Sequence, residues 1–127
     1  MGNNFIKLMA LDLWCRGVMA EVDFSDFQKL DIRIGRVISA ERVEGAAKLL
    51  RFEVDFGEFR RQSVAGLGHI YEPEDFVGKQ FVFVVNLKPK KIRGVMSECM
   101  LLAAVVNENE VIPIIPQRET PDGCKIF

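Results

Sequence analysis

Hydrophobic and polar residues alternate in the first half of the chain with the period of two that is typical of half-buried β-strands. Residues 50–56 place an apolar side chain at every second position. Residues 30–40 alternate at first and then lose this register at Gly35. Because a glycine permits a bulge or a sharp bend, we expect a long, bent first strand. Gly57 follows the second strand and offers a turn, so residues 59–65 would form the return strand of a hairpin.

Two later segments are apolar without alternation, which predicts strands that are covered on both faces. These segments are residues 80–87 and residues 100–106, and we expect them to be the most buried strands. The segment between them is basic and polar, which predicts a loop on a rigid barrel. Both apolar runs are too short to cross a bilayer as a helix, so we do not expect an integral membrane protein.

Short helical segments are predicted at two places. Ser25 and Gln28 have the spacing of a capping box, so one helical turn should precede the first strand. Residues 71–78 combine Pro73 near the start, acidic residues in the first turn and Gly78 at the end. This combination favours a second short helix.

The predicted elements together indicate an all-β protein. Five strands with a helix between the third and the fourth is the order of the oligonucleotide-binding (OB) barrel, a partly open Greek-key fold. We expect this barrel in residues 23–110. Residues 111–127 contain three prolines, which disfavour regular helix, and would form an extended C-terminal segment of the same domain. Residues 1–22 would be an N-terminal extension, either an accessory segment or the product of an upstream start.

The composition narrows the classes of function. The 127 residues are 49% hydrophobic and 28% charged, as in ordinary folded domains. The three cysteines form no Cys-x-x-Cys pair, which argues against a disulfide framework or a zinc site and favours a reducing cytoplasm. His69 is the only histidine, and no nucleophile or phosphate-loop motif is present. The sequence therefore predicts no catalytic site, no metal and no cofactor.

Positive charge is concentrated in one segment. Between Asp75 and Glu98 there are five cations and no acidic residue, so the local charge is +5 in a chain of net charge −1. Such an asymmetry steers a polyanion to one face of a protein. A solvated loop with incidental lysines is the plain alternative. However, the connection between the fourth and fifth strands of an OB barrel is a frequent nucleic-acid contact, which favours an RNA-binding segment.

Several stretches of the chain resemble the tRNA-binding domain family. They are residues 26–35, 64–67, 78–82, 86–91, 93–97 and 100–103. The family includes stand-alone structure-specific tRNA-binding proteins and the C-terminal domain, or separate beta subunit, of methionyl-tRNA synthetase. The resemblance implies a non-catalytic OB barrel that forms a homodimer and recognises the folded shape of tRNA. It also implies that such a protein acts alone or with an aminoacyl-tRNA synthetase as partner.

By the same resemblance, Lys48, Asn86, Ser97 and Met100 would contact RNA. A lysine can neutralise a phosphate, and the amide and hydroxyl can donate to phosphate or ribose oxygens. Met100 can offer an adaptable apolar contact, with core packing as its alternative role. With the neighbouring cations, the predicted RNA-binding residues are Arg33, Lys48, Asn86, Lys88, Lys90, Lys91, Arg93, Ser97 and Met100.

The chain departs from the family pattern at two places. Val43-Glu44 and Ala46-Ala47 stand where many members have His-Pro and Ala-Asp, and Glu98-Cys99 stands where Gln-Gly is usual. These changes bear on RNA affinity more than on the fold. A branch of the same superfamily resembles peptide-binding export chaperones, and this is the alternative function. It would require a sizeable apolar groove at the dimer surface and would not need positive charge.

The last segment also predicts an assembly. Residues 111–127 contain apolar side chains that one small barrel would leave uncovered. A second copy could cover them, and a two-fold pair would present two basic segments to one tRNA. The alternative is that this segment folds over its own barrel.

Overall fold

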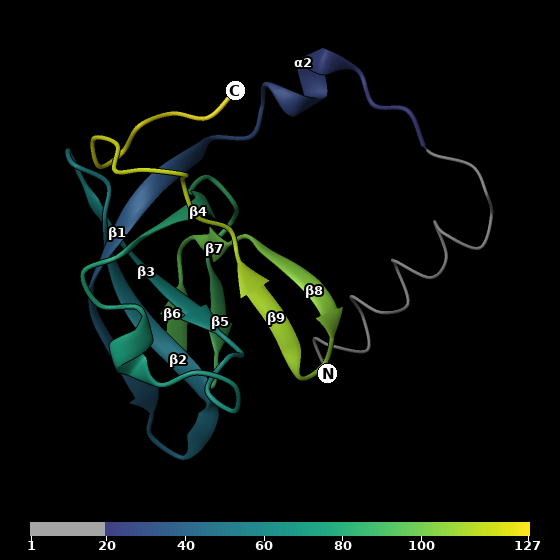
Figure 1. The fold of residues 1–127 in the computed structure, drawn as a ribbon. Coiled ribbons are helices and arrows are strands. Elements are labelled where there is room, and N and C mark those ends of the chain that lie inside the picture. Colours follow the sequence, from purple (N-terminus) through teal and green to yellow (C-terminus); the bar gives the residue numbers. More distant parts are fainter. Residues whose placement is uncertain (1–19) are drawn as a thin grey trace.

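The computed structural model describes residues 20–127, so the predicted N-terminal extension, residues 1–22, lies almost wholly outside the described residues. The centre of the described part is an antiparallel sheet of five strands in the order β3-β2-β1-β4-β7 (Figure 1). The strands are β1 (Ile32–Val43), β2 (Ala46–Asp55), β3 (Arg60–Ala65), β4 (Gln80–Val84) and β7 (Met100–Leu101). The all-β, barrel-like fold is confirmed. The sheet does not close, because no ladder joins β3 to β7 in the described residues.

The core inside this sheet is built mainly from alternate residues of β2 and β4, together with Val37 of β1. Phe52, Val54 and Phe83 are fully buried. Their burial follows from the period of two, which turns every second side chain of a strand to the same face.

Gly35 has a different role from the one that the alternation predicts. The expected bulge at this residue is wrong, because Gly35 pairs in regular register with Phe81, and the irregularity of β1 lies between Val37 and Ser39. A Cβ at position 35 would stand 2.5 Å from Cγ1 of Val54. Close packing of β1 on β2, and not a bend, therefore requires the glycine.

The basic segment is an ordered β-hairpin and not a loop, which corrects the prediction. β5 (Lys90–Ile92) and β6 (Val95–Ser97) pair with each other and form a two-stranded sheet of their own. Arg93 and Gly94, between the two strands, have φ angles of 52° and 80°. Positive φ at both positions is the geometry of a tight two-residue hairpin turn.

The single buried strand predicted over residues 100–106 is also wrong. β7 takes only the first two of these residues, and the chain then forms β8 (Ala103–Asn107), which pairs with β9 (Glu110–Pro113) beside the barrel (Figure 1). Val105 and Val106 are 48% and 61% exposed. Most of the apolar run therefore belongs to an open hairpin, in which Val105 and Val106 are exposed while Val111 packs against the core.

The C-terminal segment runs back across the barrel and pairs with the part of β1 that β2 does not reach. The Ile34 amide donates to the Cys124 carbonyl over 2.9 Å, and the Ile126 amide donates to the Ile32 carbonyl over 2.8 Å. Ile126 thereby packs on a second apolar cluster, which consists of Ile32, Ile34, Val82 and Val84. The extended tail that the prolines predict is confirmed.

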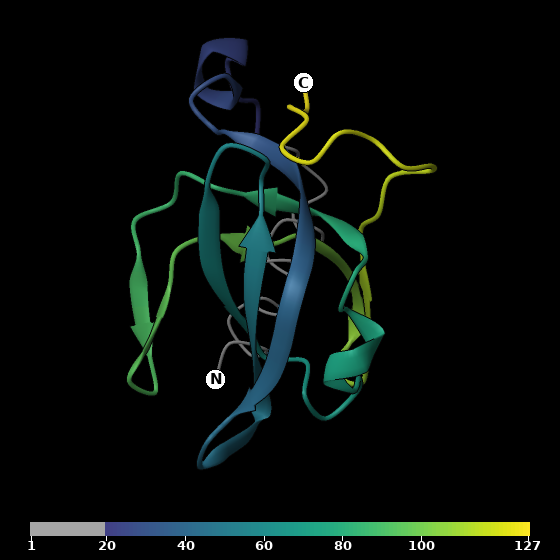
Figure 2. The same cartoon turned by 90° about the vertical axis from the view of Figure 1, so that its left-hand side faces the viewer.

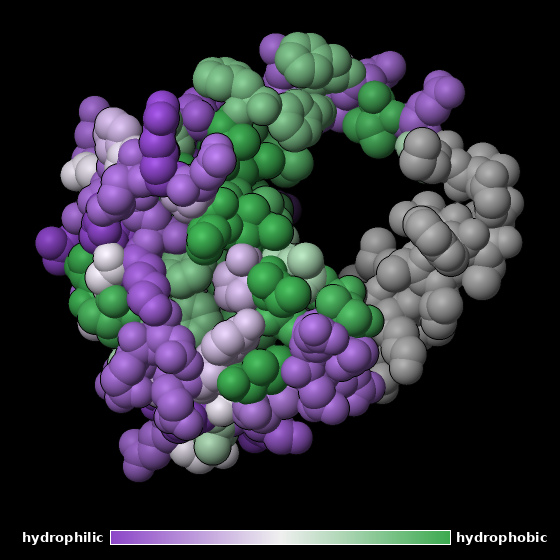
Figure 3. All heavy atoms as spheres, viewed as in Figure 1, coloured by the Kyte–Doolittle hydropathy of each residue, from purple (hydrophilic) through white to green (hydrophobic). Residues whose placement is uncertain are grey.

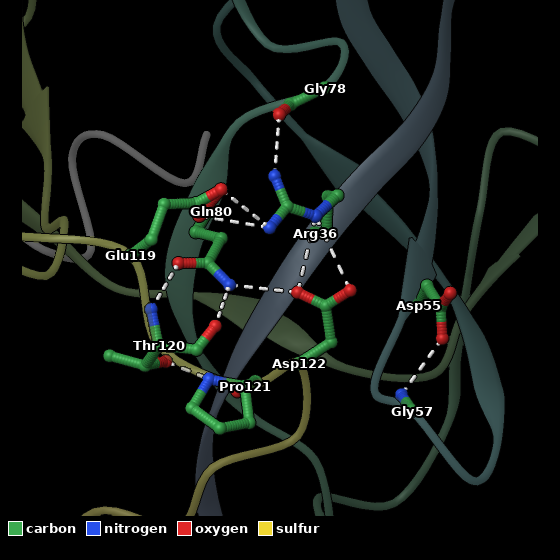
Figure 4. Close-up of polar contacts among 9 residues, drawn as sticks. All are labelled: Arg36, Asp55, Gly57, Gly78, Gln80, Glu119, Thr120, Pro121 and Asp122. Carbon is green, nitrogen blue, oxygen red and sulfur yellow. Dashed lines mark hydrogen bonds and ion pairs between the residues drawn. The ribbon is translucent and has the colours of Figure 1, made fainter.

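A polar network fixes this segment to the barrel (Figure 4). The Arg36 guanidinium lies 2.9 Å from the Glu119 carboxylate and 3.2 Å from that of Asp122. The buried Gln80 amide donates to the Thr120 carbonyl over 2.7 Å and accepts the Thr120 amide over 3.1 Å. Two side chains of the sheet thus bond to three residues of the tail, Glu119, Thr120 and Asp122.

The two helical predictions hold only in part. α2 (Phe24–Phe27) is a single helical turn, but Asp23 and not Ser25 occupies its N-cap position. The helix expected over residues 71–78 is a 3-10 turn, η1 (Pro73–Asp75). It is short because the residues that follow it already bond to the backbone of β1.

Candidate nucleic-acid interface

The β5–β6 hairpin stands away from the barrel, at the left of Figure 2. Its Lys90, Lys91 and Arg93 side chains, and that of Lys88 just before it, are exposed. None of these four cations has a carboxylate within ion-pairing distance among residues 20–127. We call these four residues the basic hairpin. Unpaired cations on one projection form a surface that suits phosphate groups.

The arginines of the sheet, in contrast, are mostly engaged within the protein. The pairs are Arg33 with Asp31, Arg36 with Glu119 and Asp122, Arg42 with Glu72, Arg51 with Glu41, and Arg60 with Glu53. The charges of these arginines are therefore already compensated, and the basic hairpin carries most of the uncompensated positive charge of the predicted site.

Arg33 illustrates this difference. Its Nε and Nη2 donate to the Asp31 carboxylate over 2.8 Å and 3.1 Å, and its guanidinium carbon lies 5.3 Å from the centroid of the Phe59 ring. The bond from Arg33 lowers the pKa of Asp31 and raises the pKa of the guanidinium. The Arg33 guanidinium is thus bonded to another side chain of the protein, and its contact with RNA stays a prediction.

Two further lysines, Lys79 and Lys48, lie apart from the basic hairpin. Lys79 directly precedes β4, and the five residues of this strand, about 16 Å at 3.3 Å per residue, together with residues 85–87 separate it from Lys88. Lys48 lies in β2 close to the β1–β2 turn, and its exposed side chain has no ion-pair partner among the described residues. Most of the positive charge of the basic segment therefore lies on the basic hairpin, and Lys48 is a separate exposed cation on β2.

Asn86 holds the chain that leads into β1. Its Oδ1 accepts the Asp31 amide over 2.8 Å, and its Nδ2 donates to the Lys29 carbonyl over 2.7 Å. The side-chain amide carries two hydrogens, so one remains for another acceptor. Asn86 is exposed, and it can therefore serve both the fold and a ligand.

Ser97 is bonded on both sides within the protein. Its hydroxyl accepts the Val64 amide over 3.1 Å and donates to the Cys99 carbonyl over 3.2 Å. Cys99 is buried, and burial raises the pKa of its thiol to about 12. The two residues thus attach the end of β6 to β3, a use of Ser97 that its family resemblance does not indicate.

Met100 lies on the surface. It is 47% exposed and pairs with Val84 across the β4–β7 ladder, which excludes core packing as its only role. Met96, which lies on β6, is 45% exposed. The sequence reasoning missed Met96, although the period of two along the hairpin could have indicated that it faces outward.

A groove that the sequence reasoning also missed lies over β1, β2 and β3. It has a volume of about 470 Å³ and is lined by Ser39, Glu41, Arg51, Glu53, Arg60, Arg61, Gln62 and Glu98. Three arginines and three glutamates balance each other, so the groove itself does not attract phosphate strongly. Its border at Glu98 adjoins the base of the basic hairpin.

No feature of residues 20–127 points to catalysis or metal binding. These residues contain no group of three metal-ligating side chains. His69 contacts the Glu108 carbonyl through Nε2 at 3.0 Å. Within the same part of the chain, no helix has the length and apolar character that a membrane crossing needs.

The sequence matches known tRNA-related proteins. A family model described as a putative tRNA binding domain matches residues 32–125. The methionine–tRNA ligase of Methanothrix thermoacetophila is 50% identical over 105 residues, which are 83% of this chain and 15% of that protein. The corresponding ligase of Bacteroides fragilis is 41% identical over 109 residues, 86% of this chain and 16% of that protein. The chain therefore spans about one sixth of the length of these curated relatives.

Two solved structures are similar over their whole length. A MetRS related protein from Pyrococcus horikoshii is 38% identical, with a TM-score of 0.81 over 86% of this chain and 100% of its own. The chaperone CsaA of Bacillus anthracis is 41% identical, with a TM-score of 0.78 over 85% of this chain and 100% of its own.

Proposed function

The chain belongs to the tRNA-binding domain family, and we propose on this premise that it binds tRNA through the basic hairpin without a catalytic step of its own. The observation that carries the proposal is a set of four exposed cations, without an ion-pair partner among residues 20–127, on and just before a hairpin that projects from a chain of net charge −1. The groove and the paired arginines of the sheet offer no comparable excess of charge.

Binding would rest on phosphate contacts that are independent of base sequence. Each cation that neutralises a phosphate releases condensed counterions, so affinity should fall as salt rises. Lys48 and the remaining amide hydrogen of Asn86 would add contacts at a second position. Met96 and Met100 would pack against ribose or base surfaces. Contacts of these kinds recognise the shape of a folded RNA and not its base sequence, as the family resemblance also implies.

The biological setting follows from the relatives. The matched relatives are methionine–tRNA ligases, and this similarity supports a role in which the domain binds tRNA either alone or together with an aminoacyl-tRNA synthetase. Its cysteine usage favours the cytoplasm as location.

We further propose a homodimer. Ile112, Ile114 and Ile115 are 49%, 42% and 61% exposed, and Phe127 is 94% exposed. Figure 3 shows a strip of apolar groups that runs from near the C-terminus down to the β8–β9 hairpin, with hydrophilic groups beside it. A second copy that covers this surface would bring two basic hairpins to one RNA molecule, which makes the second contact intramolecular.

A peptide-binding chaperone is the second candidate. The same exposed apolar surface, together with the similarity to CsaA, favours it. A titration of the chain with total tRNA beside a titration with an unfolded polypeptide distinguishes the two functions. The tRNA proposal expects salt-dependent binding of tRNA that weakens when Lys90 and Lys91 become alanine. Binding of the polypeptide alone, unchanged by this double substitution, would establish the chaperone function instead.

A further inference from the structure

Gln62 of β3 and Glu98, just after β6, are joined by two backbone-directed bonds. The Glu98 amide donates to the Gln62 carbonyl over 2.7 Å, and the Gln62 amide donates to the Glu98 carboxylate over 2.9 Å. The Gln62 side-chain amide also donates to the Met96 carbonyl of β6 over 2.8 Å. These three bonds connect the edge strand β3 to β6 and to the residue after β6, at the base of the basic hairpin.

The hairpin depends on this connection for its direction. β5 and β6 form no ladder with the five-stranded sheet, and a two-stranded hairpin by itself is only marginally stable in water. β6 does contact β3, and the bonds of Gln62 lie at this contact. They act beside the bonds of Ser97 to Val64 and Cys99, so their loss should loosen the base of the hairpin and let its cations move relative to the barrel.

Glu98 is otherwise unfavourable at this place. Its negative charge lies at the foot of a surface of four cations, where it would repel an approaching phosphate. The charge of Glu98 therefore does not favour RNA binding. Its carboxylate instead accepts the backbone amide of Gln62 and so has a structural role.

We infer that Glu98 and Gln62 are positioning residues that aim the basic hairpin at RNA. This inference rests on the proposed tRNA function. A hairpin that is held in place before binding loses less conformational freedom when RNA binds to it. This preorganisation raises the affinity for RNA, although the negative charge of Glu98 repels the phosphates. Glu98 would then raise the affinity for RNA by fixing the hairpin through Gln62, and not by direct contact with RNA.

Two substitutions of Glu98 separate position from charge. Glu98→Gln removes the charge but keeps an oxygen that accepts the Gln62 amide, so it should bind total tRNA at least as tightly as the parent. Glu98→Ala makes the same change in charge and loses the acceptor, so it should bind about fivefold more weakly than Glu98→Gln, the effect of one hydrogen bond. Glu74→Ala is the matched control, because the exposed Glu74 has no hydrogen bond or ion pair among the described residues. It should bind like the parent.

Hydrogen exchange in the RNA-free protein tests the position of the hairpin independently of the tRNA function. Amides of residues 90–97 should exchange faster in Glu98→Ala than in the parent or in Glu98→Gln, while the core of β1 and β4 stays protected. If Glu98→Ala does not fold, Gln62→Ala serves instead, since it removes only the bond to Met96 and should accelerate the same amides. Equal tRNA affinity of Glu98→Ala and Glu98→Gln, or unchanged exchange in the hairpin, would overturn the inference. Failure of the parent to bind tRNA while the exchange result holds would instead overturn the proposed function.

Discussion

The guanidinium of Arg36 in β1 lies 2.9 Å from the carboxylate of Glu119, 83 positions later in the chain. Asp122 and the Gly78 carbonyl share the same guanidinium. One arginine therefore joins the first strand, the approach to β4 and the tail. The ion pairs raise the pKa of Arg36 further above its ordinary value, so its charge persists across the accessible pH range.

Replacing Arg36 should detach the tail from the barrel. We expect Arg36→Ala to lower the free energy of unfolding by about 1–3 kcal/mol, because the partly buried Asp122 carboxylate, the Glu119 carboxylate and the Gly78 carbonyl lose their donor at once. Urea unfolding monitored by fluorescence measures this change. Glu119→Gln is the matched control, with a loss below about 1 kcal/mol, because the Glu119 side chain is largely exposed. Equal losses in both variants would contradict the central role of Arg36.

Lys90 and Lys79 offer a test of where RNA binds. Both substitutions to alanine remove one positive charge, but only Lys90 lies on the basic hairpin. Lys90→Ala should weaken tRNA binding and lower the log–log salt slope by somewhat less than one unit, while Lys79→Ala should change neither much. Filter binding across a salt series measures both quantities. If the two variants lose affinity alike, the net charge and not the hairpin determines binding.

Asn86 should couple stability to RNA affinity. Asn86→Ala leaves the Asp31 amide and the Lys29 carbonyl without their partners, so the free energy of unfolding should fall by about 1–2 kcal/mol. Affinity for tRNA should fall with an unchanged salt slope, because a neutral donor is lost. Calorimetry and a binding titration measure the two effects. Met100→Ala, at an exposed position of β7, should lower affinity without a comparable loss of stability.

Asp31 should make the free energy of unfolding depend on pH in the acidic range. The hydrogen bond from Arg33 is the main cause that lowers the pKa of Asp31 below the ordinary value of 3.8. Its stabilising contribution is therefore fully present above the unfolded-state pKa and is lost as the pH falls through the lower folded-state pKa. Urea unfolding at a series of pH values should show a smaller acid-dependent loss in Asp31→Asn than in the parent. Identical pH profiles of the two proteins would show that the pair with Arg33 contributes nothing.

The homodimer can be tested by surface substitution. Removing residues 111–127 would damage the barrel, because this segment bonds to β1 and β4. Ile112→Glu with Ile115→Glu instead changes two exposed side chains, and we expect this variant to be a folded monomer and the parent a dimer in analytical ultracentrifugation. Val77→Glu, also at an exposed apolar residue, is the control that should remain a dimer. A monomeric parent at micromolar concentration would rule out the dimer.

The five-stranded arrangement could be predicted because alternation is a local property. Leu50, Phe52 and Val54 are buried as their spacing indicates, and the family resemblance identified the barrel from short stretches that retain their order. The concentration of charge before Glu98 was equally visible, since it requires only a count of residues along the chain.

The tertiary structure decided which of these residues have partners within the fold. Arg33 meets Asp31, Ser97 meets Val64 and Glu98 meets Gln62, and the last two pairs join positions more than 30 residues apart. The structure also decided that the apolar run over residues 100–106 leaves the sheet to form an open hairpin. Composition and periodicity determine which face a side chain prefers. Which charge is compensated and which polar group remains for a ligand depends on segments that only folding brings together.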